Sequence, residues 1–141
     1  MQNKDFYNLN ISELIDLLSN LQIKETKLKK DHITKEILKV SKDIDTLLKK
    51  NKTKINAEII RKIIFVSLSN LIVWEAKDQM ISDKKNYYKI LKKALQINSI
   101  RNTVTNSMME DFNEYDFTRT RVTKFTKNEP NWKKYLQKKL K

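Results

Sequence analysis

Hydrophobic residues recur every three or four positions along most of the chain, which is the periodicity of amphipathic helices. The first apolar stripe consists of Ile11, Leu14, Leu18, Leu21 and Leu28. A capping signal stands at its start, because Asn10 precedes the stripe and Glu13 follows three residues later, as in a capping box. We therefore expect the first helix to begin directly after Asn10.

Three more helices follow from the same periodicity. Asp31 can cap a second helix, whose stripe covers residues 33–47. The third helix, at about residues 56–82, is apolar on several sides, so we expect it at the centre of the fold. Asp83 can cap a fourth helix, whose stripe covers residues 90–108.

Four long helices with short connections predict an all-α fold, an antiparallel helical bundle over residues 1–110. Residues 111–141 differ in character and are expected to form a basic C-terminal extension. Within it, residues 118–127 alternate in the manner of a β-strand, and Pro130 stands in the first turn of a predicted short helix. The sequence thus predicts one helical domain with an appended tail.

The composition removes several kinds of active site. The chain has no glycine, no cysteine and a single histidine, His32. Glycine-rich phosphate loops and the nucleophile elbow need glycine where the backbone turns tightly, and thiol catalysis and sulfur-ligated zinc need cysteine. We therefore expect no cofactor and no metal ion, and a non-enzymatic role is favoured.

The net charge of +13 is unevenly distributed. Residues 118–141 hold nine lysines and arginines against Glu129 alone, a net +8, which leaves +5 for residues 1–117. Only four of the 30 basic residues are arginine, and lysine, asparagine and isoleucine are all abundant, as is typical of an AT-rich genome. Composition and binding to an anionic partner are both open explanations of the excess.

The basic tail has three open interpretations. It can dock on its own bundle, lie on an anionic membrane or a protein partner, or bind nucleic acid. Aromatic residues alternate with basic ones, as in proteins that bind single-stranded nucleic acid. The candidate contact residues are Arg119, Arg121, Lys124, Lys127, Trp132, Lys133 and Lys134.

Polar residues interrupt the predicted apolar stripes at three places. Glu25 lies on the stripe of the first helix, and Asp78 lies four residues after Trp74, an expected core residue, on the third. Arg101 lies on the stripe of the fourth helix, three residues after Asn98. Because an unpaired charge in a core is costly, we expect Arg101 to contact Asp78, Glu25 or both, with Asn98 assisting. Such a cluster either fixes the helix register or binds a ligand.

Two pairs of acids raise one catalytic alternative. Glu13 and Asp16 are three residues apart on one helix face, as are Glu75 and Asp78. Carboxylates in this arrangement can hold Mg²⁺, as in all-helical nucleotide pyrophosphohydrolases. Such enzymes need a denser carboxylate cluster, and acids in a first helical turn already complement the helix dipole. A metal-dependent nucleotide hydrolase is therefore the third-ranked interpretation.

The segment 13–24, ELIDLLSNLQIK, resembles the opening of a small uncharacterised bacterial family with the motif S-x-G-E-L-I-D-K-x-T-I-L-x-I-K. Glu13, Asp16 and Lys24 match it, whereas Ser12 and Leu17 replace its glycine and lysine. Family members later carry a tryptophan followed by an acidic pair, and then N-x-x-R. The similar residues in this chain are Trp74, Asp78, Asn98 and Arg101. The family is associated with lipopolysaccharide and glycosyltransferase gene neighbourhoods, so the resemblance implies a link to surface-polysaccharide synthesis.

These patterns favour a non-enzymatic accessory or interaction protein with a protein partner. The alternative is a nucleic-acid-binding accessory protein that uses the basic tail. Because the sequence has no secretory signal and no apolar run long enough to span a bilayer, we expect a soluble cytoplasmic protein. The apolar third helix can be buried within the chain or between two copies, and the sequence leaves both arrangements open.

Overall fold

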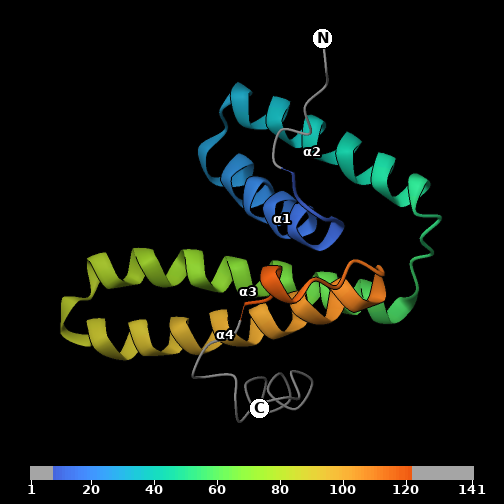
Figure 1. Ribbon diagram of the computed structural model, residues 1–141. Helices are drawn as coiled ribbons and strands as arrows, with labels where there is room; N and C mark the ends of the chain where they lie inside the picture. Colours follow the sequence, from blue (N-terminus) through green and yellow to red (C-terminus); the bar gives the residue numbers. More distant parts are fainter. Residues whose placement is uncertain (1–7, 122–141) are drawn as a thin grey trace.

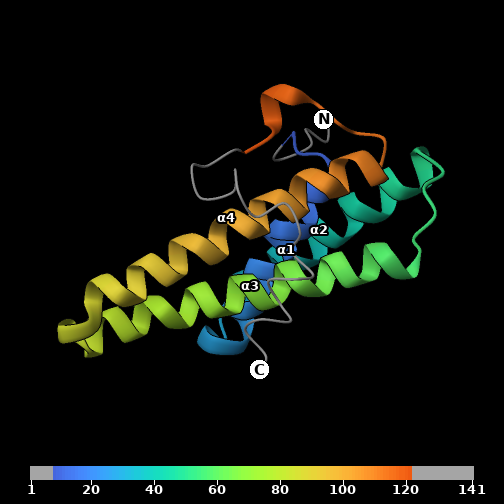
Figure 2. The ribbon, with the colours of Figure 1, turned by 90° about the horizontal axis from the view of Figure 1, so that it is seen from below.

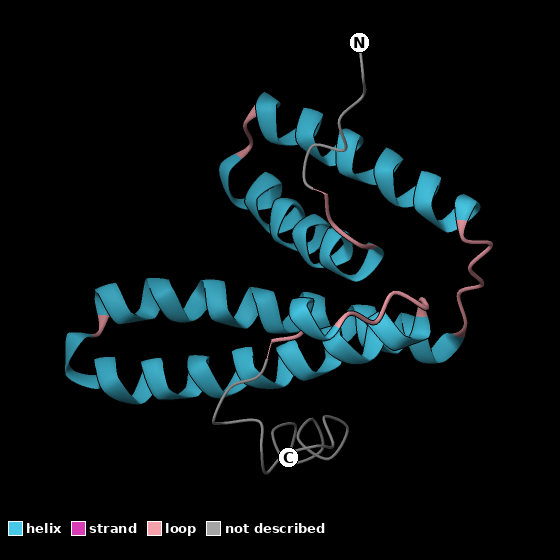
Figure 3. Ribbon diagram, viewed as in Figure 1, coloured by secondary structure: helices cyan, strands magenta, loops and turns pink. Residues whose placement is uncertain are grey.

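The structure is a computed structural model that describes residues 8–121. Most of these residues lie in four α-helices (Figure 1). In chain order the helices are α1 (Ile11–Leu28), α2 (Asp31–Lys50), α3 (Ala57–Ser82) and α4 (Tyr87–Asp111), with the short 3-10 helices η1 (Lys84–Asn86) and η2 (Phe117–Arg119). No described residue forms a strand, and the all-α prediction is confirmed (Figure 3).

Part of the predicted tail lies within the described residues. Residues 118–121 of the segment expected to be strand-like begin inside η2 and do not form a strand. The rest of that segment and the predicted short helix near Pro130 lie outside the described residues.

The four helices form two hairpins stacked on each other. α1 and α2 make one antiparallel hairpin, and α3 and α4 make the other (Figure 1). α1 packs against all three other helices, whereas α2 packs against α1. Seen from the side of the second hairpin, α1 and α2 lie behind α3 and α4 (Figure 2). α1 is therefore the central element of the fold.

One hydrophobic core joins the two hairpins. All four helices contribute to it, and so does the residue that follows α4. Its most deeply buried members are Ile11, Leu14, Val40, Val66, Val104, Met108 and Phe112. Burial of a large apolar side chain is worth roughly 1.5–3 kcal/mol, so this shared core is the main force that holds the hairpins together.

Asparagine side chains cap the N-termini of two of the helices. The Oδ1 atom of Asn10 accepts a hydrogen bond from the backbone N–H of Glu13 at 2.9 Å, and Glu13 Oε1 accepts one from the backbone N–H of Asn10 at 3.1 Å. The predicted capping box is therefore confirmed. Asn56 caps α3 in a similar way, through the backbone N–H of Ile59 at 2.9 Å.

Asp31 and Asp83 do not cap the helices that the sequence analysis assigned to them. α2 begins at Asp31 itself, after Lys30, which makes no side-chain capping bond. After Asp83 the chain forms η1 before α4 begins, and the Asp83 carboxylate accepts a hydrogen bond from Asn86 Nδ2 at 2.8 Å. An acid in the first turn still complements the helix dipole, which explains why Asp31 is suited to its position.

Because the chain has no glycine, other residues form its left-handed turns. Lys29 follows the last residue of α1 with φ 48°, and Lys52 and Asn113 follow α2 and α4 with φ 50° and 56°. Asparagine tolerates this region, but a lysine pays for the crowding of its Cβ, at about 1 kcal/mol or more. The two lysine turns therefore cost stability.

The prediction that α3 lies at the centre is wrong. α3 packs against α1 and α4, which bury Ile59, Phe65 and Val66. A third side of the helix stays exposed, because α2 lies on the opposite side of α1 and does not cover it (Figure 1). The apolar residues on that side belong to one helix face that residues 8–121 leave exposed.

The far end of the α3–α4 hairpin extends past the α1–α2 pair (Figures 1 and 2). Small residues, Ala76 and Ala94, are buried in this part of the hairpin. Ile81 and Tyr88, near η1, are 75% and 83% exposed. Among the described residues, this end therefore consists of α3 and α4 packed against each other, with η1 between them.

After α4 the chain folds back over the bundle (Figure 1). Phe112 is 1% exposed and belongs to the core, and the left-handed Asn113 turns the chain. Residues 112–121, which were assigned to the extension, thus pack on the bundle. Within residues 8–121, no helix has both the length and the apolar character needed to cross a membrane.

Candidate functional site

A polar cluster links α1, α3 and α4 in the middle of the fold. Arg101 of α4 lies 3.5 Å from the carboxylate of Asp16 on α1, with the two side chains 12% and 16% exposed. Asn70 of α3 lies between them: its Oδ1 accepts from Arg101 Nη1 at 2.6 Å, and its Nδ2 donates to Asp16 Oδ1 at 2.8 Å. Asn102 Oδ1 accepts from Arg101 Nη2 at 3.2 Å. Three helices are thus fixed relative to one another by one network.

The environment of Arg101 is unfavourable to its charge. Burial lowers the pKa of Arg101, the carboxylate of Asp16 opposes this effect, and the neighbouring charge of Arg121 adds to it. Its Nε is buried without a hydrogen-bond partner among the described residues. The interaction with Asp16 therefore offsets part of the desolvation cost of Arg101.

The sequence correctly indicated a partnered arginine but named the wrong partners. Asp78 is exposed, and Glu25 accepts hydrogen bonds from Thr34 and Gln22 instead. Asn98 is half-buried, and its place in the network is taken by Asn70 and Asn102. Asp78 lies toward the C-terminal end of α3, where the hairpin extends past α1. Glu25 lies near the C-terminal end of α1, so neither carboxylate contacts Arg101.

A second set of contacts fixes the segment after α4 to the start of α1. Arg119 pairs with Glu13 at 2.5 Å and donates to the backbone carbonyl of Asn8 at 2.9 Å. The Glu114 carboxylate accepts from the backbone N–H of Ile11 at 2.8 Å, at the N-terminus of α1. Glu13, which was part of the family-like motif, therefore both caps α1 and holds the returning chain.

Asn106 of α4 holds the last described residue. Its side-chain amide donates to the Arg121 carbonyl at 2.9 Å, and its Oδ1 accepts from the Arg121 N–H at 3.1 Å. This pair of hydrogen bonds resembles the pairing between two β-strands and fixes the backbone of Arg121 to α4.

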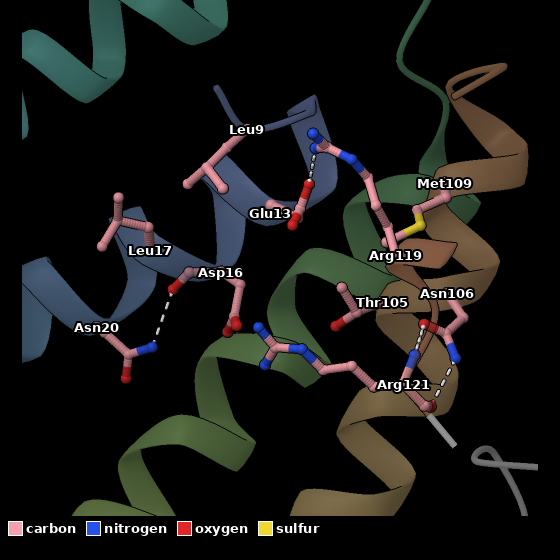
Figure 4. A pocket seen from close by; sticks show the side chains of 10 residues that line it. All are labelled: Leu9, Glu13, Asp16, Leu17, Asn20, Thr105, Asn106, Met109, Arg119 and Arg121. Carbon is pink, nitrogen blue, oxygen red and sulfur yellow. Dashed lines mark hydrogen bonds and ion pairs between the residues drawn. The ribbon is translucent and has the colours of Figure 1, made fainter. Parts of the chain in front are cut away.

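A cavity of about 220 Å³, lined by both polar and apolar residues, lies between the Arg101 cluster and the contacts of the returning segment (Figure 4). Glu13 and Asp16 reach it from α1, Thr105 and Asn106 from α4, and Arg119 and Arg121 from the returning segment. The guanidinium of Arg121 points toward Asp16 (Figure 4). Each carboxylate already has a cation, Arg119 for Glu13 and Arg101 for Asp16. Arg119 and Arg101 therefore match the two carboxylates, and Arg121 adds a positive charge to the lining of the cavity.

The two acid pairs of the metal-dependent alternative have different surroundings. Of the two acid pairs, Glu13 and Asp16 are engaged by arginines, and Glu75 and Asp78 are exposed on α3. Within the described part of the chain, no group of three or more potential metal-ligating side chains lies together.

A buried lysine was missed by the sequence analysis. Lys62 has a side chain that is 9% exposed, and its Nζ contacts Asp111 Oδ2 at 2.5 Å and Ser107 Oγ at 2.7 Å on α4. Its position three residues after Ile59 and four before Val66, both buried, was the available signal. Lys62 joins α3 to the end of α4.

An exposed apolar row runs along α3. Ile60, Ile64, Leu68 and Ile72 are spaced by four residues and are 48%, 53%, 49% and 43% exposed. Beside Leu68 and Leu71, an apolar groove of about 290 Å³ runs between α3 and α1. We call Ile60, Ile64, Leu68 and Ile72 the α3 row.

The remaining predicted residues are dispersed. Trp74 is half-buried on α3, one turn after Asn70, and Lys24 is exposed on α1. Five residues of the predicted tail site lie outside the described part of the chain: Lys124, Lys127, Trp132, Lys133 and Lys134.

Comparison of the chain with protein-family models, curated proteins and solved structures found no match.

Proposed function

We propose that this protein is a non-enzymatic accessory protein that acts by binding another protein through the α3 row. The observation that carries the proposal is the exposure of four large aliphatic side chains along one helix face. Single exposed aliphatic residues are normal on protein surfaces, whereas contiguous ones mark interaction sites.

Leu38 on α2 provides the contrast within the same chain. It is 66% exposed, more than any member of the α3 row. The residues one turn away on its helix, Thr34 and Lys42, are polar. Leu38 is thus an isolated apolar residue, and the four-residue row is not explained by a general excess of exposed aliphatic side chains.

The chemistry of the face defines the partner. The row requires an apolar surface, and a helix packed along it satisfies that requirement best, because side chains spaced by four residues form a ridge that fits the groove of another helix. Charged residues stand at both ends of the face, with Arg61 near the start of α3 and Glu75 near its end. A partner therefore needs an acidic and a basic end in the opposite order.

Other expectations remain proposals beside this one. The link to surface-polysaccharide synthesis rests on the family resemblance. Nucleic-acid binding by residues 118–141 depends mainly on lysines outside the described residues, and Arg119 is engaged by Glu13. The ion pairs around the cavity beside Glu13 and Asp16 support a structural role for it, so the α3 row is the better candidate for binding.

The absence of cysteine from the chain allows a direct test. Ile60→Cys and Leu38→Cys would each be labelled with benzophenone maleimide in the full chain and irradiated in an extract of the cells that produce it. The proposal expects a discrete protein adduct from position 60 and none from position 38. Equal labelling from both positions, or no adduct from position 60, would overturn it.

A further inference from the structure

We infer that the partner of the α3 row is a second copy of this chain, packed antiparallel about a two-fold axis that passes between Ile64 and Leu68. The inference rests on the proposed function and names its partner. Three features of the described residues carry it: the spacing of the row, the order of charges along the face, and the groove beside Leu68.

The spacing of the row is self-complementary. Its four members are four residues apart, so the row has a midpoint at residue 66. A two-fold axis at that midpoint places Ile64 opposite Leu68 of the second copy, and Ile60 opposite Ile72 of the second copy. An interface of this kind uses the same patch twice, as in most homodimers.

The geometry of the helix permits this contact. Rows of residues spaced by four are inclined by about 26° to the helix axis, and two such rows interdigitate when the helices cross at about −50°. All four aliphatic side chains then contact aliphatic side chains of the second copy, and none is left against a charge.

The order of charges selects the antiparallel arrangement. Arg61 lies at the beginning of the exposed face, and Glu75 and Asp78 lie at its end. Arg61 is 57% exposed in its side chain and lies 3.9 Å from Glu58, a weak surface pair. Antiparallel helices bring Arg61 toward the acidic end of the second copy, whereas parallel helices would place arginine near arginine and acid near acid.

The groove supplies the third feature. It is bounded by Ile23 on α1 and by Leu68 and Leu71 on α3, and its lining is mainly apolar. It lies directly beside the middle of the row, where the two-fold axis would bring the aliphatic side chains of the second copy. Each copy thus offers the aliphatic side chains of its α3 row and, beside Leu68, a recess for those of the other copy.

The mass of the full chain in solution tests the inference. Sedimentation velocity is expected to give twice the chain mass of 16.9 kDa at about 100 µM. Leu68→Glu is expected to raise the dissociation constant at least about thirtyfold, since each interface would receive two buried carboxylates. The matched control Leu38→Glu is expected to leave it unchanged, with far-UV circular dichroism unchanged in both variants. A monomeric wild type, or equal effects of the two variants, would overturn the inference.

Disulfide cross-linking tests the orientation in a chain that has no cysteine of its own. Mixed Ile60→Cys and Ile72→Cys chains are expected to form a disulfide-linked pair under mild oxidation, and Ile60→Cys alone is expected not to. Efficient cross-linking of Ile60→Cys with itself would indicate parallel helices and overturn the arrangement.

The two proposals fail in different ways. If the purified chain is monomeric but position 60 gives an adduct with a different polypeptide in the extract, the dimer is wrong and the interaction role stands. If the chain is monomeric and binds anionic vesicles in a manner that Leu68→Glu abolishes, the face contacts a membrane and both proposals are wrong. If neither the purified chain nor the extract gives an adduct, both are wrong as well.

Discussion

Substitution of Asp16 by asparagine should destabilise the fold more than the loss of any exposed carboxylate. Asp16→Asn preserves the shape of the side chain and an oxygen that can accept from Asn70, so it removes mainly the negative charge 3.5 Å from Arg101. Removal of one member of a buried ion pair typically costs about 3–5 kcal/mol. Because both side chains retain some exposure and the asparagine can still bond, we expect about 2 kcal/mol here.

Urea unfolding followed by circular dichroism measures this effect. With a urea dependence of about 1.5 kcal/mol/M, a loss of 2 kcal/mol lowers the midpoint by about 1.3 M. The protein concentration must be the same in every experiment, because a dimer unfolds in a concentration-dependent way. Glu25→Gln is the matched control, since Glu25 is a carboxylate of the same helix whose hydrogen bonds to Gln22 and Thr34 are exposed, and it should cost less than about 0.5 kcal/mol.

A double variant separates charge from packing. Asp16→Asn with Arg101→Met removes both charges, so no unpaired cation stays buried, and the double variant should be more stable than Asp16→Asn alone. Equal stability of Asp16→Asn and the wild type, or a cost for Glu25→Gln as large as that for Asp16→Asn, would refute the role assigned to the cluster.

Three further predictions use the same measurements. Asp111→Ala should cost about 2–3 kcal/mol because it leaves Lys62 buried without its carboxylate, whereas Lys62→Met should cost less, as urea midpoints would show. Burial raises the pKa of Glu114 above its ordinary value of 4.5, so folding favours the protonated carboxyl and this stabilisation is lost as the pH rises through the folded pKa. Glu114→Gln should therefore raise the melting temperature at neutral pH, and the gain should vanish below about pH 4.5; a gain that persists in acid would contradict this. Lys29→Gly should raise the free energy of unfolding by about 0.5–1 kcal/mol, since glycine adopts φ 48° without a Cβ clash, and a loss of stability would contradict the strain inferred there.

Local signals in the sequence sufficed for most of the fold. The stripe after Asn10, with Glu13 in the third helical position, predicted the start of α1 because a capping box depends only on neighbouring residues. The start of α4 was less well predicted, because Asp83 is followed by η1 rather than by the helix itself. The position of a helix along the chain follows from the local hydrophobic pattern. Its exact first and last residues depend on capping hydrogen bonds, which several neighbouring residues can make.

The contacts between helices were harder to predict. The apolar character of α3 suggested a central helix, but periodicity does not tell which face a neighbour covers, and α1 took the central place instead. The need of Arg101 for a carboxylate followed from its position in a stripe. That Arg101 pairs with Asp16, with Asn70 between them, depends on how the two hairpins pack against each other. No local sequence pattern determines this packing.

The extension of the α3–α4 hairpin past its support divides α3 into two parts of unequal local stability. Amide hydrogens near η1, where no other described helix lies beside the hairpin, should exchange through local opening well below the free energy of global unfolding. The half of α3 that carries Ile60, Ile64 and Leu68 is packed on α1 and α4 and is already ordered. A partner that binds this half meets a preformed helix, so association there loses little conformational entropy, and most of the free energy of contact remains available for affinity.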